Sequence, residues 1–177
     1  QRITGPVAEI DPTATARTFP LVIDDDPESV FHYVDTASSR AEIVCASKKL
    51  MLNSVAILGL GGTGGYLLDL VSKTPVRKIH IFDGDSFDQH NAFRAPGAAS
   101  GEDLDAKLRK VEYFHAIYGR MHKGIVPHPE YMSEANLDAM DRMDFVFIAM
   151  EAGDVKKRVV ERLLARGIPF VDVGMGV

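Results

Sequence analysis

From about residue 38 onward, strand-like and helix-like segments alternate along the chain, and this alternation is the strongest constraint on its fold. We expect the short apolar segments to be buried strands, over residues 54–60, 76–82, 124–129, 144–150 and 168–174. The segments before and between them have helical length and polar faces, which predicts helices over residues 38–52, 64–73, 101–118, 133–140 and 154–167. Strands joined by helices of this length require a mainly parallel sheet with helices on both faces. The sequence therefore predicts an α/β doubly wound domain.

The first 37 residues differ from the rest of the chain in composition and periodicity. They contain four prolines, the acidic triplet Asp24-Asp25-Asp26 and little periodicity. We therefore expect residues 1–37 to form an irregular arm, in which residues 19–23 are the candidate for an edge strand. Residues 38–177 then form the α/β domain, and its first helix is expected to be capped by Ser38 or Ser39.

Composition excludes several classes of protein. A formal net charge of −5 without any basic stripe argues against a nucleic-acid-binding surface. No apolar run approaches the ~20 residues of a membrane span, and no basic-then-apolar signal pattern appears. Cys45 is the single cysteine, so an internal disulfide and a cysteine-rich zinc site are excluded, and we expect it to be a small core residue. These features favour a cytoplasmic protein that binds neither nucleic acid nor membrane.

A glycine-rich loop joins the first predicted strand to the helix that follows it. Five of the seven residues from 59 to 65 are glycine, and Gly59, Gly61 and Gly64 satisfy G-x-G-x-x-G, with Gly62 between them. Such glycines let the backbone approach a phosphate, while the helix N-terminus contributes free N–H groups and a positive dipole. A tight packing turn without a ligand is the alternative. The motif predicts a nucleotide-binding, Rossmann-like fold but leaves NAD, FAD and ATP open.

The stretch IFDGDSFDQHNAFR, residues 81–94, narrows the choice of ligand. Asp83 ends the second predicted strand, 24 residues after Gly59, where an acid can accept hydrogen bonds from ribose hydroxyls. Arg94, on a turn held by Asn91, would offer a planar pair of donors to phosphate. An NAD enzyme has no general need for this Asn and Arg, although a solvated surface arginine remains the alternative. The stretch therefore favours a phosphate-facing site at the end of the second strand.

Four segments, in this order, resemble the ThiF/MoeB adenylyltransferases, the bacterial relatives of ubiquitin-activating enzymes: VAILGLGGTGG, IFDGDSFDQHNAFR, KVEYF and DFVFIAME. The family pattern after the second strand matches Asp83, Asp85, Asn91 and Arg94 without a gap. The resemblance covers about residues 38–177. The segment HNAFRAPGA departs from the family's usual N-L-x-R-Q, which indicates a divergent branch, of a kind found beside bacterial ubiquitin-like proteins.

The resemblance implies a reaction and its partners. Family members bind ATP and Mg²⁺ and join AMP to the C-terminal glycine carboxylate of a small ubiquitin-like protein of the ThiS/MoaD type, with release of pyrophosphate. A carboxylate and an α-phosphate must then meet, so cations have to neutralise both. Arg94 matches the family arginine near the phosphates, and Lys110 matches the lysine that contacts the triphosphate. Lys107 and Arg109 are expected to be solvated neighbours of Lys110.

Glu151 stands where the family usually has an aspartate that helps to hold Mg²⁺. Glutamate is also a hard oxygen ligand, although its extra methylene moves the carboxylate. The resemblance therefore implies that Glu151 is the metal ligand. An altered site, or an ion pair between Glu151 and Lys156 or Lys157, is the alternative.

The resemblance also implies a homodimer in which an arginine enters the partner's nucleotide site. Arg40 lies in the matching region, but its surroundings differ from the family's R-x-x-R-Q, so a surface arginine is the alternative. In the family, further strands follow the last predicted strand and carry substrate contacts and, in many members, a catalytic cysteine. We expect the natural chain to continue beyond Val177, and we expect no thioester on Cys45.

Two other functions remain open at the level of sequence. One is a nucleotide-binding but catalytically reduced scaffold subunit, favoured by Glu151. The other is an NAD-dependent oxidoreductase, favoured by the glycine loop and Asp83 and opposed by Asn91, Arg94 and Lys110.

Overall fold

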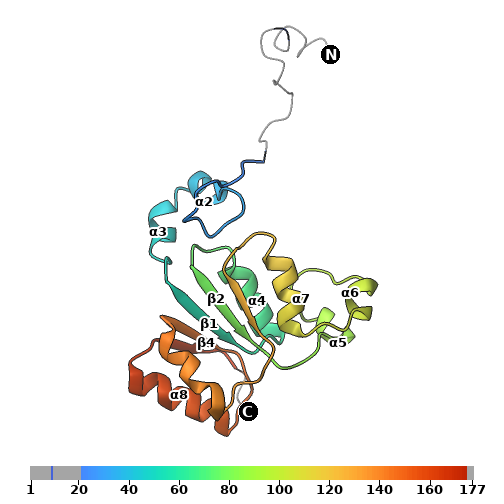
Figure 1. The fold of residues 1–177 in the computed structure, drawn as a ribbon, viewed down its shortest axis with the longest axis vertical. Helices are drawn as coiled ribbons and strands as arrows, with labels where there is room; N and C mark the ends of the chain where they lie inside the picture. Colours follow the sequence, from blue (N-terminus) through green and yellow to red (C-terminus); the bar gives the residue numbers. More distant parts are fainter. Residues whose placement is uncertain (1–8, 10–20, 175–177) are drawn as a thin grey trace.

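The computed structural model describes residue 9 and residues 21–174, and its centre is a five-stranded sheet (Figure 1). All neighbouring strands pair in parallel, in the order β3-β2-β1-β4-β5. The strands are β1 (Ser54–Leu58), β2 (Lys78–Phe82), β3 (Ile125–His128), β4 (Phe145–Ile148) and β5 (Phe170–Asp172). The order reverses at β1, because the chain moves outward through β2 and β3 and then crosses back to β4. The prediction of a doubly wound parallel sheet is confirmed.

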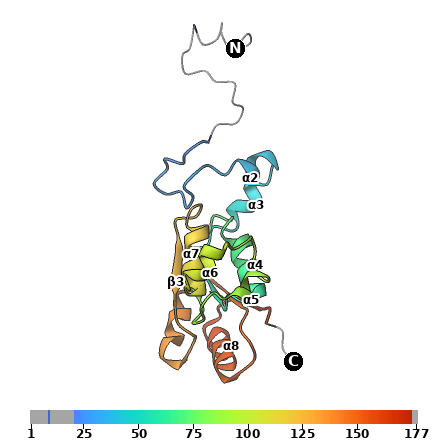
Figure 2. The same ribbon diagram turned by 90° about the vertical axis from the view of Figure 1, so that its right-hand side faces the viewer.

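Alternate residues of the strands build two hydrophobic cores, one on each face of the sheet. Val55 and Ile57 of β1 pack toward α4 (Gly62–Val71) and α7 (Lys110–Tyr118). Ala56 and Leu58 pack on the opposite face, toward the 3₁₀ helix η1 (Glu134–Arg142) and toward α8 (Asp154–Arg166). Both faces of β1 are apolar because helices cover both, which is typical of parallel sheets. Figures 1 and 2 show α8 apart from α4 and α7.

Two helix termini follow the sequence closely. Ser133 is the N-cap of η1, where its backbone N–H donates to the Asn136 side chain at 2.8 Å. Gly167 ends α8 with a φ of +66°, a left-handed conformation that glycine adopts without steric cost. The predicted helix at 133–140 is nevertheless a 3₁₀ helix rather than an α-helix.

The single helix predicted over residues 101–118 is wrong. It is divided into α6 (Gly101–Asp105) and α7, with Lys107 at a φ of +47° between them. The break has a physical cause, because residues 108–110 bond to the loop after β2. The Phe87 N–H donates to the Leu108 carbonyl at 2.8 Å, and the Lys110 N–H donates to the Asp85 carbonyl at 2.9 Å. Lys110 therefore begins a helix instead of lying in the middle of one.

The helix predicted over residues 38–52 is also divided, into α2 (Thr36–Arg40) and α3 (Val44–Lys48). Asp35, not Ser38 or Ser39, caps α2 by accepting the N–H groups of residues 37 and 38. Glu42, between α2 and α3, has a φ of +58° and so interrupts the helical backbone. Cys45 lies on α3 and is exposed, so the expectation of a core cysteine is wrong. Neither short helix has a buried residue. The apolar residues of this segment therefore do not mark a helix that packs on the core, which is why the prediction of one long helix failed.

The predicted arm lies partly outside the described residues, which omit 1–8 and 10–20. In its described part, Ile23 forms an antiparallel bridge with Tyr33 rather than pairing with the sheet, so the predicted edge strand is wrong for that residue. Residues 30–32 are fixed to the turn before β3, where the Lys123 N–H donates to the Val30 carbonyl at 2.7 Å. The division at residue 37 stays a prediction. Among the described residues, no helix is long and apolar enough to cross a membrane.

Candidate functional site

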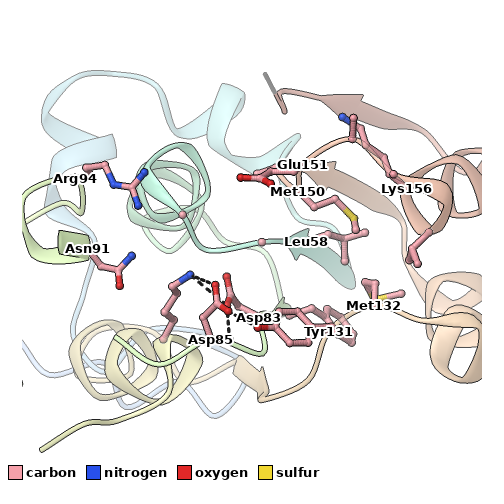
Figure 3. A pocket seen from close by; sticks show the side chains of 18 of the residues that line it. Leu58, Asp83, Asp85, Asn91, Arg94, Tyr131, Met132, Met150, Glu151 and Lys156 are labelled. Atoms are coloured by element: carbon pink, nitrogen blue, oxygen red, sulfur yellow. Dashed lines mark hydrogen bonds and ion pairs between the residues drawn. The ribbon is translucent and has the colours of Figure 1, made fainter. Parts of the chain in front are cut away.

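A cavity of about 570 Å³ opens at the carboxyl ends of β1, β2 and β4, where the strand order reverses. In open α/β sheets this crevice is the usual place for a ligand. Figure 3 shows Arg94 and Asn91 on one side of it and Leu58, Met132 and Met150 on the other. The cavity brings together most residues predicted from the sequence: Gly59, Gly61, Asp83, Asp85, Asn91, Arg94, Lys110 and Glu151.

The glycine loop between β1 and α4 is shaped by two close backbone approaches. Gly59 has a φ of +91°, which disfavours any residue with a side chain. A Cβ on Gly64 would overlap the carbonyl oxygen of Gly59, so the loop and the first turn of α4 pack backbone against backbone. Gly61 differs, because it lines the cavity and a Cβ there would meet nothing within 4 Å. The loop thus leaves open space beside the N-terminus of α4, where an anion is stabilised.

Asp83 links the glycine loop to the loop after β2. Its Oδ2 accepts the Leu60 N–H at 2.7 Å, and its Oδ1 accepts the Asp85 N–H at 2.8 Å. The residue is only 7% exposed. Oδ1 also lies near the ammonium group of Lys110, whereas Oδ2 keeps a second acceptor position, so Asp83 can link both loops and still accept a hydroxyl from the cavity.

Lys110 is the buried cation of the site. Its side chain is 8% exposed, and its Nζ lies 2.5 Å from Asp85 Oδ2 and 3.5 Å from Asp83 Oδ1. The hydrogen bond from Lys110, with a second one from Tyr131, lowers the pKa of Asp85. Two carboxylates therefore share one ammonium group. A phosphate that entered the cavity would compete with Asp85 for Lys110.

Arg109, the residue before Lys110, is exposed as the sequence suggested, but its side chain also has a partner on the loop after β2. It is the N-cap residue of α7, and its guanidinium donates to the carbonyl of Gly84, between the two acids. Arg109 is thus a support of the acidic loop. Lys107 is also exposed, as expected.

Arg94 and Asn91 lie at the end of α5 (Gln89–Ala92), and they have different tasks. Asn91 is buried, and its Oδ1 accepts the Asp88 N–H at 2.9 Å, while its carbonyl accepts the Arg94 N–H at 2.9 Å. Asn91 therefore fixes the turn and does not hold the guanidinium directly. Arg94 is exposed, and within residues 21–174 its guanidinium has no hydrogen-bond or ion-pair partner. This cation is available to a ligand.

Glu151 follows β4 and lines the cavity (Figure 3). The alternative ion pairs do not form, because Lys156 bonds to Asp172 at 2.9 Å and Lys157 lies 4.0 Å from Glu161. Across the described part of the chain, Glu151 has no polar partner, and no group of three or more metal-binding side chains occurs. The carboxylate is thus an available oxygen ligand, but a single one.

Arg40 is not part of this cavity. It is the last residue of α2, beside the end of the sheet where the strands begin, whereas the cavity lies where they end (Figure 1). Gly62 and Gly64, on the first turn of α4, also do not line the cavity directly.

An apolar wall of the cavity and a tyrosine beside it were not predicted from the sequence. The wall consists of Leu58, Phe82, Met132, Met150 and Val155. Tyr131 lies after β3, and its hydroxyl donates to Asp85. Residues that follow β3 could have been sought as site residues because the carboxyl ends of parallel strands share one edge. The cavity thus combines an apolar end, suited to an aromatic base, with a cationic end suited to phosphate.

Comparison with known proteins places these features in a family. A sequence model of the ThiF family matches residues 36–176. Among solved structures, the E. coli tRNA N6-threonylcarbamoyladenosine dehydratase TcdA in complex with AMP is similar at 18% identity and a TM-score of 0.69, over 86% of this chain and 61% of that one. A structure of E. coli MccB with MccA-N7isoASN is similar at 18% identity and a TM-score of 0.64, over 78% of this chain and 43% of that one. A comparison with curated protein sequences finds no match.

At these identities the solved structures establish the fold alone. The chain spans less than two thirds of the length of TcdA and less than half of that of MccB. The parallel sheet with helices on both faces is common to all three.

Proposed function

The chain belongs to the ThiF family, and from this premise we propose that it is an ATP-dependent adenylating enzyme. In the proposed reaction, a carboxylate attacks the α-phosphate of ATP, an acyl–AMP anhydride forms and pyrophosphate leaves. The observation that carries the proposal is that two cations, the exposed Arg94 and the buried Lys110, line the same cavity as the glycine loop. A nicotinamide cofactor would need no such pair.

The parts of ATP have matching surroundings in the cavity. The apolar wall accepts the adenine, and Asp83 accepts a ribose hydroxyl with its remaining lone pairs. The open space at Gly61 and the first N–H groups of α4 accept phosphate oxygens. A cavity of about 570 Å³ is within the range of pockets that enclose molecules of this size.

The two cations would act at different stages. Arg94 has no partner among the described residues, so it can meet the incoming phosphates at once. Lys110 must first exchange Asp85 for phosphate, because its ammonium group is bonded to Asp85. Donors already in place where negative charge develops are usually the largest contribution to catalysis. Arg94 and Lys110 are accordingly the proposed catalytic residues.

The site offers an available carboxylate, that of Glu151, for a Mg²⁺ ion. Mg²⁺ commonly binds through one or two carboxylates, substrate phosphates and several waters, and does not need a cage of protein ligands. Glu151 supplies one such carboxylate, and its lack of a partner in the described chain leaves it available. When bound, the ion would neutralise phosphate charge.

For the acceptor we propose the C-terminal glycine of a small ubiquitin-like protein, of the ThiS/MoaD type or a bacterial ubiquitin-like one, on the ground of the motifs in residues 55–151. We also propose that the enzyme is a homodimer and works in the cytoplasm, where ATP is available. Its net charge of −5 gives no support to nucleic-acid binding.

Exchange of labelled pyrophosphate into ATP tests the function. The enzyme should catalyse exchange only when a ubiquitin-like protein with a free C-terminal glycine is present, and the same protein with a C-terminal amide is the matched control. ATP binding without exchange would favour the scaffold subunit. Binding of NAD in preference to ATP would favour the oxidoreductase and reject the proposal.

A further inference from the structure

Tyr131 is packed on the acidic loop in a way that only glycine at position 84 allows. A Cβ on Gly84 would lie 2.6 Å from two atoms of the Tyr131 ring, so the ring rests directly on the backbone between Asp83 and Asp85. Tyr131 is nevertheless 63% exposed and lines the cavity. Its ring therefore lies against the backbone of the acidic loop and beside both acids, as Figure 3 shows.

Polar contacts hold the tyrosine at both ends. Its hydroxyl donates to Asp85 Oδ1, and its carbonyl accepts the Asn136 side chain of η1 at 3.0 Å. Asp85 is thus shared, because its Oδ1 bonds to Tyr131 and its Oδ2 bonds to Lys110 at 2.5 Å. A chain of hydrogen bonds therefore links Asn136 of η1, through Tyr131 and Asp85, to the buried ammonium group of Lys110.

The charges explain what this connection can do. Without a ligand, Lys110 balances one of two carboxylates. When a phosphate takes Lys110, Asp85 loses its main cationic partner and would face the phosphate with an unpaired charge. A hydrogen-bond donor that stays on Asp85 reduces the cost of this exchange, and a phenol hydroxyl in a fixed position is such a donor.

We infer that Tyr131 is a positioning residue, which holds Asp85 through its hydroxyl and thereby sets how readily Lys110 passes from Asp85 to a nucleotide phosphate. The inference rests on the proposed function, because it takes a nucleotide phosphate as the group that receives Lys110. Tyr131 acts through Asp85 and does not itself touch the reacting atoms.

The first experiment needs no nucleotide. The side-chain carboxyl of Asp85 is titrated by NMR in the wild-type chain, in Tyr131→Phe and in Tyr66→Phe. Tyr66 is an exposed tyrosine on α4 outside the cavity and serves as the matched control. Tyr131→Phe should raise the pKa of Asp85, because the hydroxyl that lowers it is gone. Tyr66→Phe should leave this pKa unchanged.

The second experiment follows the nucleotide. In Tyr131→Phe, Lys110 is the sole strong partner of Asp85, so the KM for ATP in pyrophosphate exchange should rise about tenfold, the value of one hydrogen bond to a charged group. The kcat should be unchanged, since the ammonium group still reaches the phosphate once ATP is bound. In an Asp85→Asn background the same substitution should have no effect on ATP affinity, because the group through which it acts is absent.

The outcomes separate this inference from the proposed function. An unchanged Asp85 pKa in folded Tyr131→Phe overturns the inference, whether or not ATP binds. Equal weakening of ATP binding in the wild-type and Asp85→Asn backgrounds also overturns it, because Tyr131 would then act on the nucleotide directly. If calorimetry finds no ATP binding by the wild-type chain, the proposed function fails, while the titration still decides whether Tyr131 controls Asp85.

Discussion

At the level of single residues, the two cations of the cavity differ in what surrounds them. Arg94 is exposed and has no partner in the described chain, whereas Lys110 is buried against Asp83 and Asp85. Removal of an exposed, unpartnered cation leaves the fold unchanged. Removal of Lys110 leaves the buried Asp83 without its nearest cation, which is destabilising, whereas the half-exposed Asp85 can be solvated.

Alanine at the two positions should therefore separate function from stability. Arg94→Ala should lose roughly 10²- to 10³-fold in the rate of pyrophosphate exchange with an unchanged free energy of unfolding. Lys110→Ala should lose a similar factor in rate and also some stability, because the buried carboxylate of Asp83 loses its nearest cation. Exchange kinetics and urea unfolding provide the two readouts. Lys157→Ala, an exposed lysine of α8, is the control and should behave as wild type. Equal stability of the Arg94 and Lys110 variants would show that the ion pairs of Lys110 do not stabilise the fold.

At the level of elements, strand positions followed well from the sequence, while two helices did not. Buried strands of a parallel sheet are apolar on both faces and so are easily recognised. The breaks at Glu42 and Lys107 depend on bonds to distant residues, such as the one between the Lys110 N–H and the Asp85 carbonyl, which local periodicity does not contain. The site residues on strand ends were predictable from topology. Tyr131 follows β3 at the same edge, so topology could have pointed to its position, but its contact with Gly84 leaves no pattern in the sequence because Gly84 carries no side chain.

The glycine loop gives a prediction about two residues three positions apart. Gly61→Ala should fold with wild-type stability, because its backbone φ is −67° and a Cβ meets only open space, but it should weaken ATP binding by filling that space. Gly64→Ala should be destabilised by about 3 kcal/mol, because its Cβ would overlap the Gly59 carbonyl. Thermal unfolding and calorimetry with ATP distinguish the two effects. Wild-type ATP affinity in Gly61→Ala would show that phosphate does not approach there.

Strands β2 and β3 carry a histidine pair that predicts a pH dependence. His80 Nδ1 and His128 Nε2 lie 2.9 Å apart. Burial, with the charges of His128 and Lys78, lowers the pKa of His80 from 6.5 to about 4, and burial lowers that of His128. The unfolded chain then binds more protons than the folded one between these values, so stability should fall as the pH drops from 6.5 to about 4. His80→Asn should reduce this fall, as measured by urea unfolding at pH 7 and pH 5.

A matched variant controls the histidine prediction. His115 is an exposed histidine of α7, and His115→Asn should keep the wild-type dependence on pH. If His80→Asn and wild type lose stability equally on acidification, the neutral histidine pair is not the cause.

At the level of the whole molecule, Arg40 lies at the end of the sheet opposite the cavity, so in one chain it cannot serve the nucleotide. Closed two-fold pairs are the commonest oligomers, and only a second copy could bring Arg40 to a site. We therefore expect a homodimer in which inactive Arg40→Ala and inactive Arg94→Ala subunits regain activity when mixed, because one of the two sites is then intact. The measurement is pyrophosphate exchange by verified mixed dimers. No recovery would leave Arg40 as a surface residue.

The central claim is that the cavity is built for ATP, and calorimetric titration of the wild-type chain with ATP and with NAD, each with and without Mg²⁺, tests it most directly. We expect ATP to bind more tightly than NAD, Mg²⁺ to strengthen ATP binding, and Arg94→Ala to weaken it. Binding of NAD in preference to ATP would show that the cavity is not an ATP site. ATP binding that Arg94→Ala does not change would show that Arg94 does not contact the nucleotide.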